Sequence, residues 1–551
     1  MSRLYKEFVI EELNEKGHVT KVSFKKDPYF NFAYDVVDRL AVEKPDKLAM
    51  VWCNEAGDEK YITFSDVKEN SDRIASWLLS LGIKKGDPVM LILKRHYEWW
   101  YFMIALHKIG AIAIPATNQL MTKDIEYRVN AASIKAVVCT SDGNISDLVD
   151  EAQAMTETLK VKIIVRGVKE GWISYEEGVK NAPPFVPPTG EARPKADEIM
   201  LMYFSSGTTG MPKMVAHNYY YPLGHIPTAV YWHNVAQDGL HFTVSETGWG
   251  KAVWGKLYGQ WLAEATVFTF DFDRFNPLEL LKRIEKYKVT TFCAPPTIYR
   301  FLIKEDLSGF DLSSLKYCTT AGEALNPEVF NKFREMTGIR IMEAFGQTET
   351  TACLMTPYWM EPKPGAMGKP SPHYDIDLVD EDGNSVEPGE VGEIVVRYGE
   401  EMPVGLMIGY YRDEERTNQA RHDGLYHTGD TAWRDEDGYF WYVGRTDDII
   451  KSSGYRIGPF EVESVIMEHK SVLECAVTGV PDPIRGNIVK ATIVLAKGYN
   501  PSEELKKEIQ EYVKSHTAPY KYPRIIEFVD ELPKTISGKI RRTEIRARDR
   551  K

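Results

Sequence analysis

Short apolar runs alternate with helical patterns over the first part of the chain. Residues 63–83 carry apolar side chains at helical spacing and predict an amphipathic helix. Residues 87–93, 134–140 and 161–167 are apolar runs of strand length. Strands that alternate with helices in this way predict an α/β fold whose sheets are mostly parallel.

The pattern changes in the second half. A proline-rich link at residues 181–197 precedes a predicted strand at 198–204. Residues 374–397 contain two alternating strands around Asp-Gly and Pro-Gly turns, which predict a β-rich subdomain. Residues 471–480 and 489–496 are typical of strands in a small α+β tail.

The tail should also contain a helix at residues 502–516, because Ser502 can cap it and Leu505, Ile509 and Val513 form one apolar stripe.

A chain of 551 residues is too long for one ordinary core. We therefore predict a large N-terminal α/β domain of several subdomains at residues 1–446. A small, mobile α+β domain is expected at residues 447–551, with Asp447 at the hinge.

No segment of the sequence predicts a membrane span or a signal peptide. The most apolar stretch, residues 99–116, is interrupted by His107 and Lys108 and predicts a buried helix followed by a strand. The first residues mix acidic and basic side chains without the apolar core of a signal peptide. These features predict a soluble, cytoplasmic protein.

Composition narrows the class of protein further. The net charge of -12 and the pI near 5.6 argue against a nucleic-acid partner and against adsorption to anionic lipid. The cysteines are scattered with no short pair; they are Cys53, Cys139, Cys293, Cys318, Cys353 and Cys475. A C-x-x-C zinc or redox site is therefore absent, and reduced, buried thiols are expected.

Residues 205–213 read SSGTTGMPK and directly follow a predicted strand. Backbone N–H groups and hydroxyls in such a loop can bind phosphate oxygens, and Lys213 adds a positive charge. The pattern is not a Walker loop, because its glycines are three residues apart and Pro212 precedes the lysine. Taken alone, the stretch is about equally consistent with a surface turn and with a phosphate site.

Five further motifs follow in order: TAGEAL (320–325), MEAFGQTET (342–350), LYHTGD (425–430), GRTDDIIKSSGYRIGPFEVES (444–464) and LPKTISGK (532–539). Together with the loop they resemble the adenylate-forming superfamily of acyl-CoA synthetases, luciferases and peptide-synthetase adenylation domains. The resemblance covers nearly the whole chain. The stretches TGWGKAVWG, GPFEVES, VPDPIRG and TAPYKYPR are most similar to AMP-forming medium-chain acyl-CoA synthetases.

The resemblance implies a two-step reaction with ATP, Mg²⁺ and CoA. A carboxylate attacks the α-phosphate of Mg-ATP and releases pyrophosphate, and the CoA thiol then displaces AMP to form a thioester. Both steps build negative charge, so we expect catalysis to depend on placed cations and hydrogen-bond donors more than on a protein nucleophile.

The resemblance also assigns the nucleotide site. It implies that ATP and AMP contact Ser205, Ser206, Gly207, Thr208, Thr209, Gly210, Lys213, Gly322, Glu323, Ala324, Phe345, Gly346, Gln347, Asp430 and Arg445. Among these, Phe345 should stack on the base, and Asp430 and Arg445 should bind the ribose. Thr348 would contact the α-phosphate, and Glu349 would hold Mg²⁺.

The C-terminal residues carry two further roles by resemblance. Lys539 should bridge the carboxylate and the α-phosphate oxygens during adenylation, before the small domain rotates about Asp447 for the second step. CoA is then expected to contact Ser453, Gly454, Tyr455, Arg456, Arg485, Lys514, Tyr522, Pro523 and Arg524. The sequence departs from the family at Asn487, where members commonly have an acidic residue, so that position carries no assignment.

The acyl pocket is assigned through Gly346 and Trp254. Short-chain acetyl-CoA synthetases have a tryptophan at the position of Gly346, so glycine predicts an open pocket floor and acids longer than acetate or propionate. Trp254, Tyr258 and Trp261 are spaced as one face of a helix, a pattern more typical of core than of pocket. Lys256 lies among these apolar residues, and its side chain could either reach solvent or contact a polar group of the substrate.

We therefore predict an AMP-forming acyl-CoA synthetase that acts on medium-chain or branched fatty acids. The alternatives are an aryl (benzoate-type) CoA ligase and an adenylating enzyme with another acyl acceptor. The expected partners are a small carboxylic acid, ATP and CoA, with neither nucleic acid nor an integral membrane segment. The sequence leaves the oligomeric state open, a homo-oligomer included.

Overall fold

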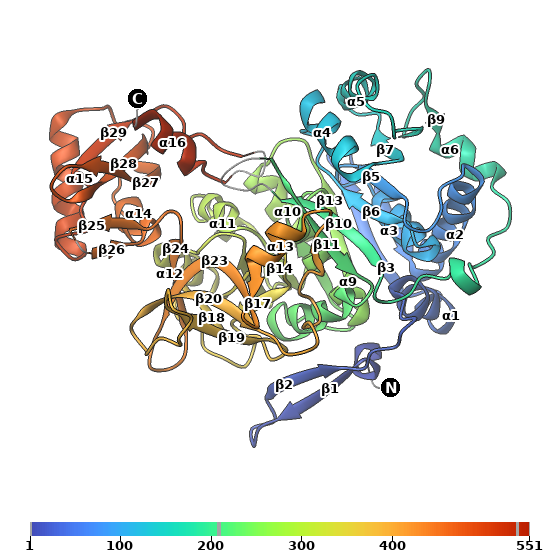
Figure 1. The fold of residues 1–551 in the computed structure, drawn as a ribbon, viewed down its shortest axis with the longest axis horizontal. Helices are drawn as coiled ribbons and strands as arrows, with labels where there is room; N and C mark the ends of the chain where they lie inside the picture. The colour runs from blue at the N-terminus through green and yellow to red at the C-terminus, as the bar shows by residue number, and fades with distance from the viewer. Residues whose placement is uncertain (1–2, 206–210, 454, 536–538, 550–551) are drawn as a thin grey trace.

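The computed structural model describes residues 3–205, 211–453, 455–535 and 539–549. A large N-terminal domain contains two extended sheets, and a smaller C-terminal domain, red in Figure 1, stands at its side. This architecture confirms the predicted α/β class with a small C-terminal domain. The boundary at Asp447 stays a prediction.

The first sheet has eight strands. Their order is β21 (Gly409–Tyr410), β11 (Lys213–Asn218), β10 (Ile199–Ser205), β6 (Ile112–Pro115), β5 (Pro88–Ile92), β7 (Ala136–Thr140), β8 (Val161–Val165) and β9 (Ile173–Ser174). From β10 through β6, β5, β7 and β8 to β9 the neighbouring strands run parallel, as the alternating pattern predicted. The strand β11 joins antiparallel to β10 and brings the sequence after the SSGTTGMPK loop back into the sheet.

Helices accompany this sheet; they are α1 (Arg39–Glu43), α2 (Phe64–Ser80), α3 (Glu98–Ile109), α4 (Thr122–Ala132), α5 (Ile145–Gln153) and α6 (Tyr175–Gly178). The helix α2 begins after Thr63, whose side chain caps it together with Asp66. The whole of α3 is buried. Its Lys108 is accommodated there because Nζ lies 2.7 Å from Asp38 and 2.5 Å from Asp72.

The second sheet is larger and mixed. Its order is β19 (Asp375–Val379), β20 (Val391–Arg397), β23 (Leu425–Arg434), β24 (Phe440–Arg445), β18 (Ala366–Pro370), β17 (Ala352–Met355), β16 (Ile341–Gly346), β15 (Tyr317–Ala321), β14 (Thr291–Cys293), β12 (Leu240–Thr243), β13 (Thr266–Asp271), β3 (Leu48–Asn54) and β4 (Glu59–Thr63), with β22 (Arg421–His422) beside β23. The strands from β3 to β16 run parallel, and those from β17 to β19 run antiparallel. The antiparallel part is the β-rich subdomain that the sequence predicted.

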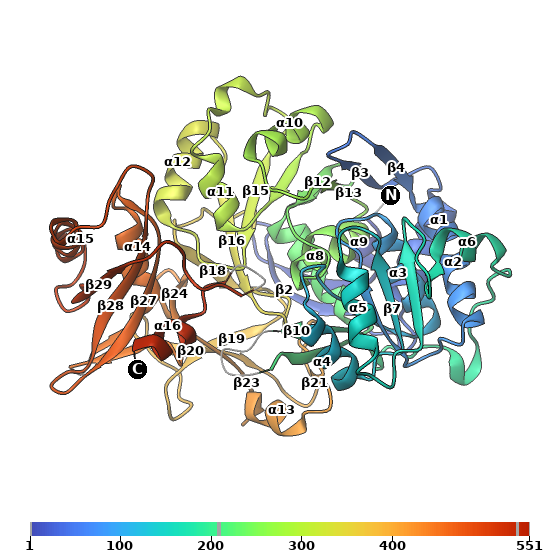
Figure 2. The ribbon, with the colours of Figure 1, turned by 90° about the horizontal axis from the view of Figure 1, so that it is seen from above.

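The remaining N-terminal helices are α7 (His225–Pro227), α8 (Gly250–Lys256), α9 (Tyr258–Leu262), α10 (Pro277–Tyr287), α11 (Pro296–Leu302), α12 (Pro327–Thr337) and α13 (Glu414–Ala420). The helices α10, α11 and α12 lie side by side beside the parallel strands (Figure 2). A hairpin of β1 (Val9–Leu13) and β2 (Val19–Phe24) projects from the N-terminal end (Figure 1). All six cysteines are buried and free, as predicted.

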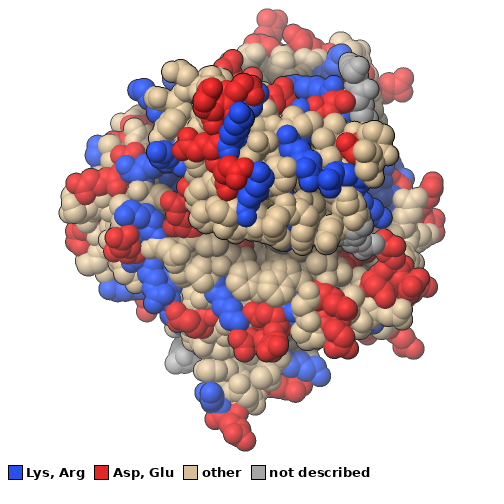
Figure 3. All heavy atoms as spheres, turned by 90° about the vertical axis from the view of Figure 1, so that its left-hand side faces the viewer, with Lys and Arg blue, Asp and Glu red and all other residues tan. Residues whose placement is uncertain are grey.

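The C-terminal domain has its own core. It contains β25 (Ile450–Ser452), β26 (Tyr455–Ile457), α14 (Pro459–Met467), β27 (Val472–Asp482), β28 (Gly486–Leu495), α15 (Glu503–His516), β29 (Ile525–Phe528) and α16 (Arg542–Asp549). Ser502 caps α15 by accepting from Leu505 N at 3.1 Å, and Leu505, Ile509 and Val513 are buried, as predicted. On the face of this domain that Figure 3 shows, acidic and basic side chains are interspersed.

Candidate active site

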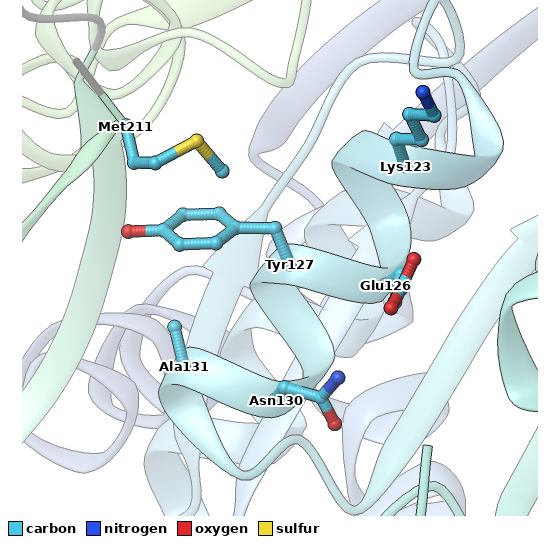
Figure 4. A pocket seen from close by; sticks show the side chains of 6 residues that line it. All are labelled: Lys123, Glu126, Tyr127, Asn130, Ala131 and Met211. Carbon is cyan, nitrogen blue, oxygen red and sulfur yellow. The ribbon is translucent and has the colours of Figure 1, made fainter. Parts of the chain in front are cut away.

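The predicted phosphate loop connects two paired strands. Ser205, at the end of β10, is the register partner of Lys213, at the start of β11. Ser206, Gly207, Thr208, Thr209 and Gly210 lie outside the described residues. Tyr127 of α4 donates to Pro212 O at 3.0 Å, and a hollow of about 570 Å³ lies between α4 and Met211 (Figure 4).

Lys213 and Glu349 meet at Tyr410. The Tyr410 hydroxyl donates to Glu349 Oε1 at 3.0 Å and lies 3.4 Å from Lys213 Nζ. Glu349 is buried. Burial also lowers the pKa of Lys213, and the negative charge of Glu349 opposes that shift. A carboxylate and a lysine are therefore held on either side of one phenol.

Two further predicted segments end neighbouring parallel strands. Gly322 to Ala324 follow β15, and Gln347 to Glu349 follow β16, its partner in the sheet. Ligands of α/β proteins bind outside the carboxyl ends of parallel strands, so the fold brings both segments to one edge. Gly322 has a φ of +104°, a backbone conformation that favours glycine.

His217, on a strand of the first sheet, forms a hydrogen bond to the turn that follows a strand of the second sheet at this edge. Its Nε2 lies 2.8 Å from the carbonyl oxygen of Thr348, and burial lowers the pKa of His217 to about 4. The imidazole is therefore neutral at pH 7, and Nε2 carries the proton in this contact. The strand β11 thus fixes the turn that holds Thr348 and Glu349.

The predicted ribose pair is adjacent in the β-rich subdomain. Asp430 on β23 is the register partner of Arg445 on β24, and Arg445 Nη1 lies 3.3 Å from Asp430 Oδ2. Gln347 Nε2 donates to the same oxygen at 2.5 Å, and the Tyr442 hydroxyl donates to Oδ1 at 3.1 Å. Burial raises the pKa of Asp430, while Arg445, these two hydrogen bonds and the charge of Lys539 oppose the shift.

That last effect comes from the C-terminal lysine predicted to act in adenylation. Lys539 is exposed, and its backbone N–H donates to Thr535 Oγ1 at 3.1 Å. The intervening residues 536–538 lie outside the described part of the chain. The positive charge of Lys539 therefore acts on Asp430 and favours its ionised form.

The last helix, α16, contacts the expected hinge at residues 447 and 448. Arg445 Nε lies 3.7 Å from Asp447 Oδ1, and Arg546 of α16 lies 3.5 Å from the carbonyl oxygen of Asp447. Arg546 also pairs with Asp448, which is buried. The segment that contains Lys539 and α16 is thereby attached directly to residues 447 and 448.

The residues assigned to CoA form two groups. Arg485 contacts Ser453 at 3.4 Å, and Tyr455 stacks on Tyr520 with ring centroids 4.0 Å apart. Separately, Lys514 and Arg524 flank the Tyr522 ring at 4.5 and 4.8 Å, next to the buried Pro523. Gly454 and the side chain of Arg456 lie outside the described part. Asn487 donates to Lys451 O at 3.2 Å.

The space beside Gly346 differs from the open pocket floor that the sequence predicted. A Cβ atom at Gly346 would lie 2.4 Å from Thr351 O and 2.5 Å from Trp254 Cη2. The indole of Trp254 and a backbone carbonyl therefore already occupy this space. Glycine is required here for close packing, and the assignment of Gly346 and Trp254 to the acyl pocket stays a prediction.

The aromatic stripe does not lie on one continuous helix. The helix α8 ends at Lys256 and α9 begins at Tyr258, with Leu257 at φ -146° and ψ -87° between them. Glycines before and after the break weaken helix formation. Tyr258 and Trp261 belong to the core. Lys256 does not reach solvent, since it is 1% exposed and donates to Ser245 O at 2.6 Å.

Sequence reasoning missed three side chains at this edge: Tyr410, Tyr442 and Lys251. The Tyr442 ring lies 6.5 Å from that of Phe345, the residue expected to stack on the base. Lys251 donates to Ala321 O at 2.8 Å. Burial lowers the pKa of Lys251, and the electrostatic effects of Cys293 and Glu323 oppose this shift. The lysine in TGWGK was the one signal in the sequence for this group.

The fold and this site define an adenylate-forming enzyme, and comparison with known proteins agrees. The AMP-binding enzyme family model matches residues 37–411, and the AMP-binding enzyme C-terminal domain model matches residues 461–539. The chain belongs to the AMP-binding enzyme family.

Relatives of similar length indicate which reaction this member of the family catalyses. The chain is 42% identical to the mitochondrial acyl-coenzyme A synthetase ACSM3 of Mus musculus, over 95% of this chain and 91% of that protein. It is 41% identical to the mitochondrial ACSM5 of Homo sapiens, over 95% and 91%. It is 42% identical to 4-hydroxybutyrate–CoA ligase 1 of Metallosphaera sedula, over 94% and 91%. The predicted activity, AMP-forming acyl-CoA synthesis, is confirmed.

Solved structures show the same fold. The anthranilate CoA ligase AuaEII, solved with anthranoyl-AMP, superposes with a TM-score of 0.87 and 29% identity, covering 95% of this chain and 98% of that one. A benzoate CoA ligase from Burkholderia xenovorans gives a TM-score of 0.81 and 27% identity, covering 94% and 100%. Among the described residues, no helix combines the length and apolar character needed to cross a membrane.

Proposed function

We propose that the protein activates a medium-chain or branched aliphatic acid with Mg-ATP and transfers the acyl group to CoA. The observation that carries this proposal is the convergence of Lys213, Glu349, Asp430 and Arg445 on one edge of the fold, where the charge of Lys539 also acts on Asp430. Cations together with the carboxylates of Glu349 and Asp430 around a nucleotide site suit a reaction that builds charge on phosphate.

In the first step, a carboxylate oxygen of the acid forms a bond to the α-phosphorus and the bond to pyrophosphate breaks. Lys213 would stabilise the departing pyrophosphate, and Lys539 would bridge the carboxylate and the α-phosphate oxygens. Thr348 would donate to the same phosphate. Asp430 and Arg445 would hold the ribose, and Phe345 the base.

Magnesium fits this site as an ion carried largely by ATP. The described residues contain no cluster of three or more metal-ligating side chains, whereas Glu349 presents a single buried carboxylate. Mg²⁺ in such enzymes is bound by one or two carboxylates together with substrate phosphates. When bound there, the ion would neutralise charge on the phosphates.

In the second step, the CoA sulfur would attack the acyl carbon and AMP would leave. We propose that rotation about Asp447 replaces Lys539 with the segment around Ser453 and Tyr455, which would line the pantetheine tunnel. Arg485, Lys514, Tyr522, Pro523 and Arg524 would bind the nucleotide end of CoA. The contacts of Arg485 with Ser453 and of Lys514 and Arg524 with Tyr522 support this assignment.

The test is pyrophosphate release with ATP and a panel of acids, followed by thioester formation when CoA is added. We expect release with butanoate, hexanoate and 2-methylbutanoate above that with acetate. Benzoate tests the aryl alternative. 4-Hydroxybutanoate belongs in the panel because one relative is named for it. If pyrophosphate is released without CoA and no thioester forms when CoA is added, the result would instead support an adenylating enzyme with another acyl acceptor.

The compartment is proposed as cytoplasmic, as expected from the sequence. Several of the mammalian relatives are named as mitochondrial, so the relatives do not support this assignment. Fractionation of cells that express the protein at its native level would decide it.

A further inference from the structure

His225 is a buried imidazole without a protein partner. It is 0% exposed, and neither Nδ1 nor Nε2 has a hydrogen-bond partner. Other buried histidines of the described chain have at least one ring nitrogen paired; in His241, both are, at 2.7 and 2.8 Å to threonine hydroxyls. An unpaired buried polar group costs about 1–3 kcal/mol, so it points to a bound polar group.

The His225 ring lies next to the side chain assigned to the acyl pocket. Its centroid is 6.0 Å from Trp254, 4.7 Å from Tyr221 and 6.0 Å from Tyr258. Trp254 in turn fills the space beside Gly346, which is two residues from Thr348. A line of contacts therefore leads from the segment expected at the α-phosphate through Trp254 to His225.

Other polar atoms near these rings are also unpaired. The hydroxyl of Tyr203 and Oε1 of Gln260 are buried without a partner. Tyr203 acts electrostatically on Tyr258, and Gln260 donates through Nε2 to Trp254 O at 3.1 Å. Unpaired polar atoms therefore accompany the aromatic side chains around His225.

The chemistry of the missing group follows from its surroundings. Burial lowers the pKa of His225 well below its ordinary value, so the ring is neutral and offers one donor and one acceptor. The groups that act electrostatically on it are His217 and His373, both neutral for the same reason. A charged group would be desolvated here without a counter-charge, whereas a hydroxyl can both donate and accept.

We propose that His225 determines specificity by hydrogen-bonding a hydroxyl at the far end of the acyl chain, so that the preferred acid is an aliphatic ω-hydroxy acid. Trp254 would move aside as the chain enters. The inference rests on the proposed function and names the substrate class of that site. It does not alter the assignment of the nucleotide residues.

The experiment compares acids of equal size with and without the hydroxyl. Pyrophosphate release is measured for 4-hydroxybutanoate against pentanoate and for 5-hydroxypentanoate against hexanoate, with the full-length protein. We expect kcat/KM to favour at least one hydroxy acid over its alkyl counterpart by about tenfold or more. His225→Phe should abolish that preference by lowering kcat/KM for the hydroxy acid alone.

The matched control is His241→Phe, which removes a buried imidazole whose two nitrogens are paired. It should lower the thermal midpoint and leave the hydroxyl preference unchanged, whereas His225→Phe should not lower the midpoint. His225→Leu serves if the phenylalanine variant fails to fold. A wild-type enzyme that activates alkyl acids without favouring either hydroxy acid overturns the inference alone. If no acid in the panel supports pyrophosphate release, the proposed function fails instead.

Discussion

Replacing Gly346 by alanine tests whether Trp254 fills the acyl pocket. The added methyl would lie 2.4 Å from Thr351 O and 2.5 Å from Trp254 Cη2, both shorter than real Cβ contacts allow. Because one of these atoms belongs to the backbone, local movement cannot relieve both contacts. Overpacking of this kind costs about 1–3 kcal/mol of folding free energy.

A double-mutant cycle separates the two contacts. Trp254→Leu removes the indole and makes room for the methyl, but the carbonyl of Thr351 remains. Gly346→Ala combined with Trp254→Leu should therefore be less destabilised than the sum of the single variants, with a coupling of about 0.5–3 kcal/mol. Each kcal/mol moves the midpoint by about 2–4 °C in domains of 150–250 residues, and by less in a larger domain.

The assays are thermal unfolding by circular dichroism and pyrophosphate release with acetate and hexanoate. Gly346→Ala should lower the midpoint of thermal unfolding. It should also reduce kcat/KM for hexanoate more than for acetate, because only the longer chain needs the space that opens when the Trp254 indole moves aside. Additive changes in the midpoint would refute the contact between Gly346 and Trp254. An unchanged chain-length profile would remove Gly346 from the acyl pocket.

Three further outcomes test the proposed mechanism and the fold. Lys539→Ala should abolish adenylation but spare thioester formation from supplied acyl-AMP, while Lys534→Ala, in the same segment, should spare both; equal loss of the two steps in Lys539→Ala would contradict its role. Asp447→Pro should block one of the two steps, so full turnover in this variant would argue against rotation at that residue. Burial raises the pKa of Glu343 from 4.5 to about 8, so the folded state keeps a proton that the unfolded state releases, and stability should fall as pH rises between these values. Unfolding followed across pH should show this slope in the wild type and lose it in Glu343→Gln, whereas identical slopes would show that Glu343 ionises normally.

Local sequence rules predicted much of the fold because they act over short distances. The helix α2 follows from its apolar spacing, and α15 from Ser502 and its apolar stripe. The nucleotide segments were found for a related reason, since each is a short motif at the end of a strand. Their meeting at one edge follows from parallel strand order.

Other features depend on contacts between distant segments. Tyr410 reaches Glu349 because β21 pairs with β11, a pairing that neither strand encodes alone. The absence of a side chain at Gly346 indicated an open space, but the fold places an indole from elsewhere in it. The break at Leu257 likewise follows from close packing around the flanking glycines, where a Cβ at Gly259 would lie 2.3 Å from His225 O.

The attachment of α16 to residues 447 and 448 has a practical consequence for the study of this enzyme. Any fusion attached at the C-terminal side of α16 would be joined to a helix that holds the proposed pivot. Such a partner would load the pivot mechanically and could slow turnover without touching a substrate. A fluorophore at an exposed position of α16 would, for the same reason, report the rotation as it happens.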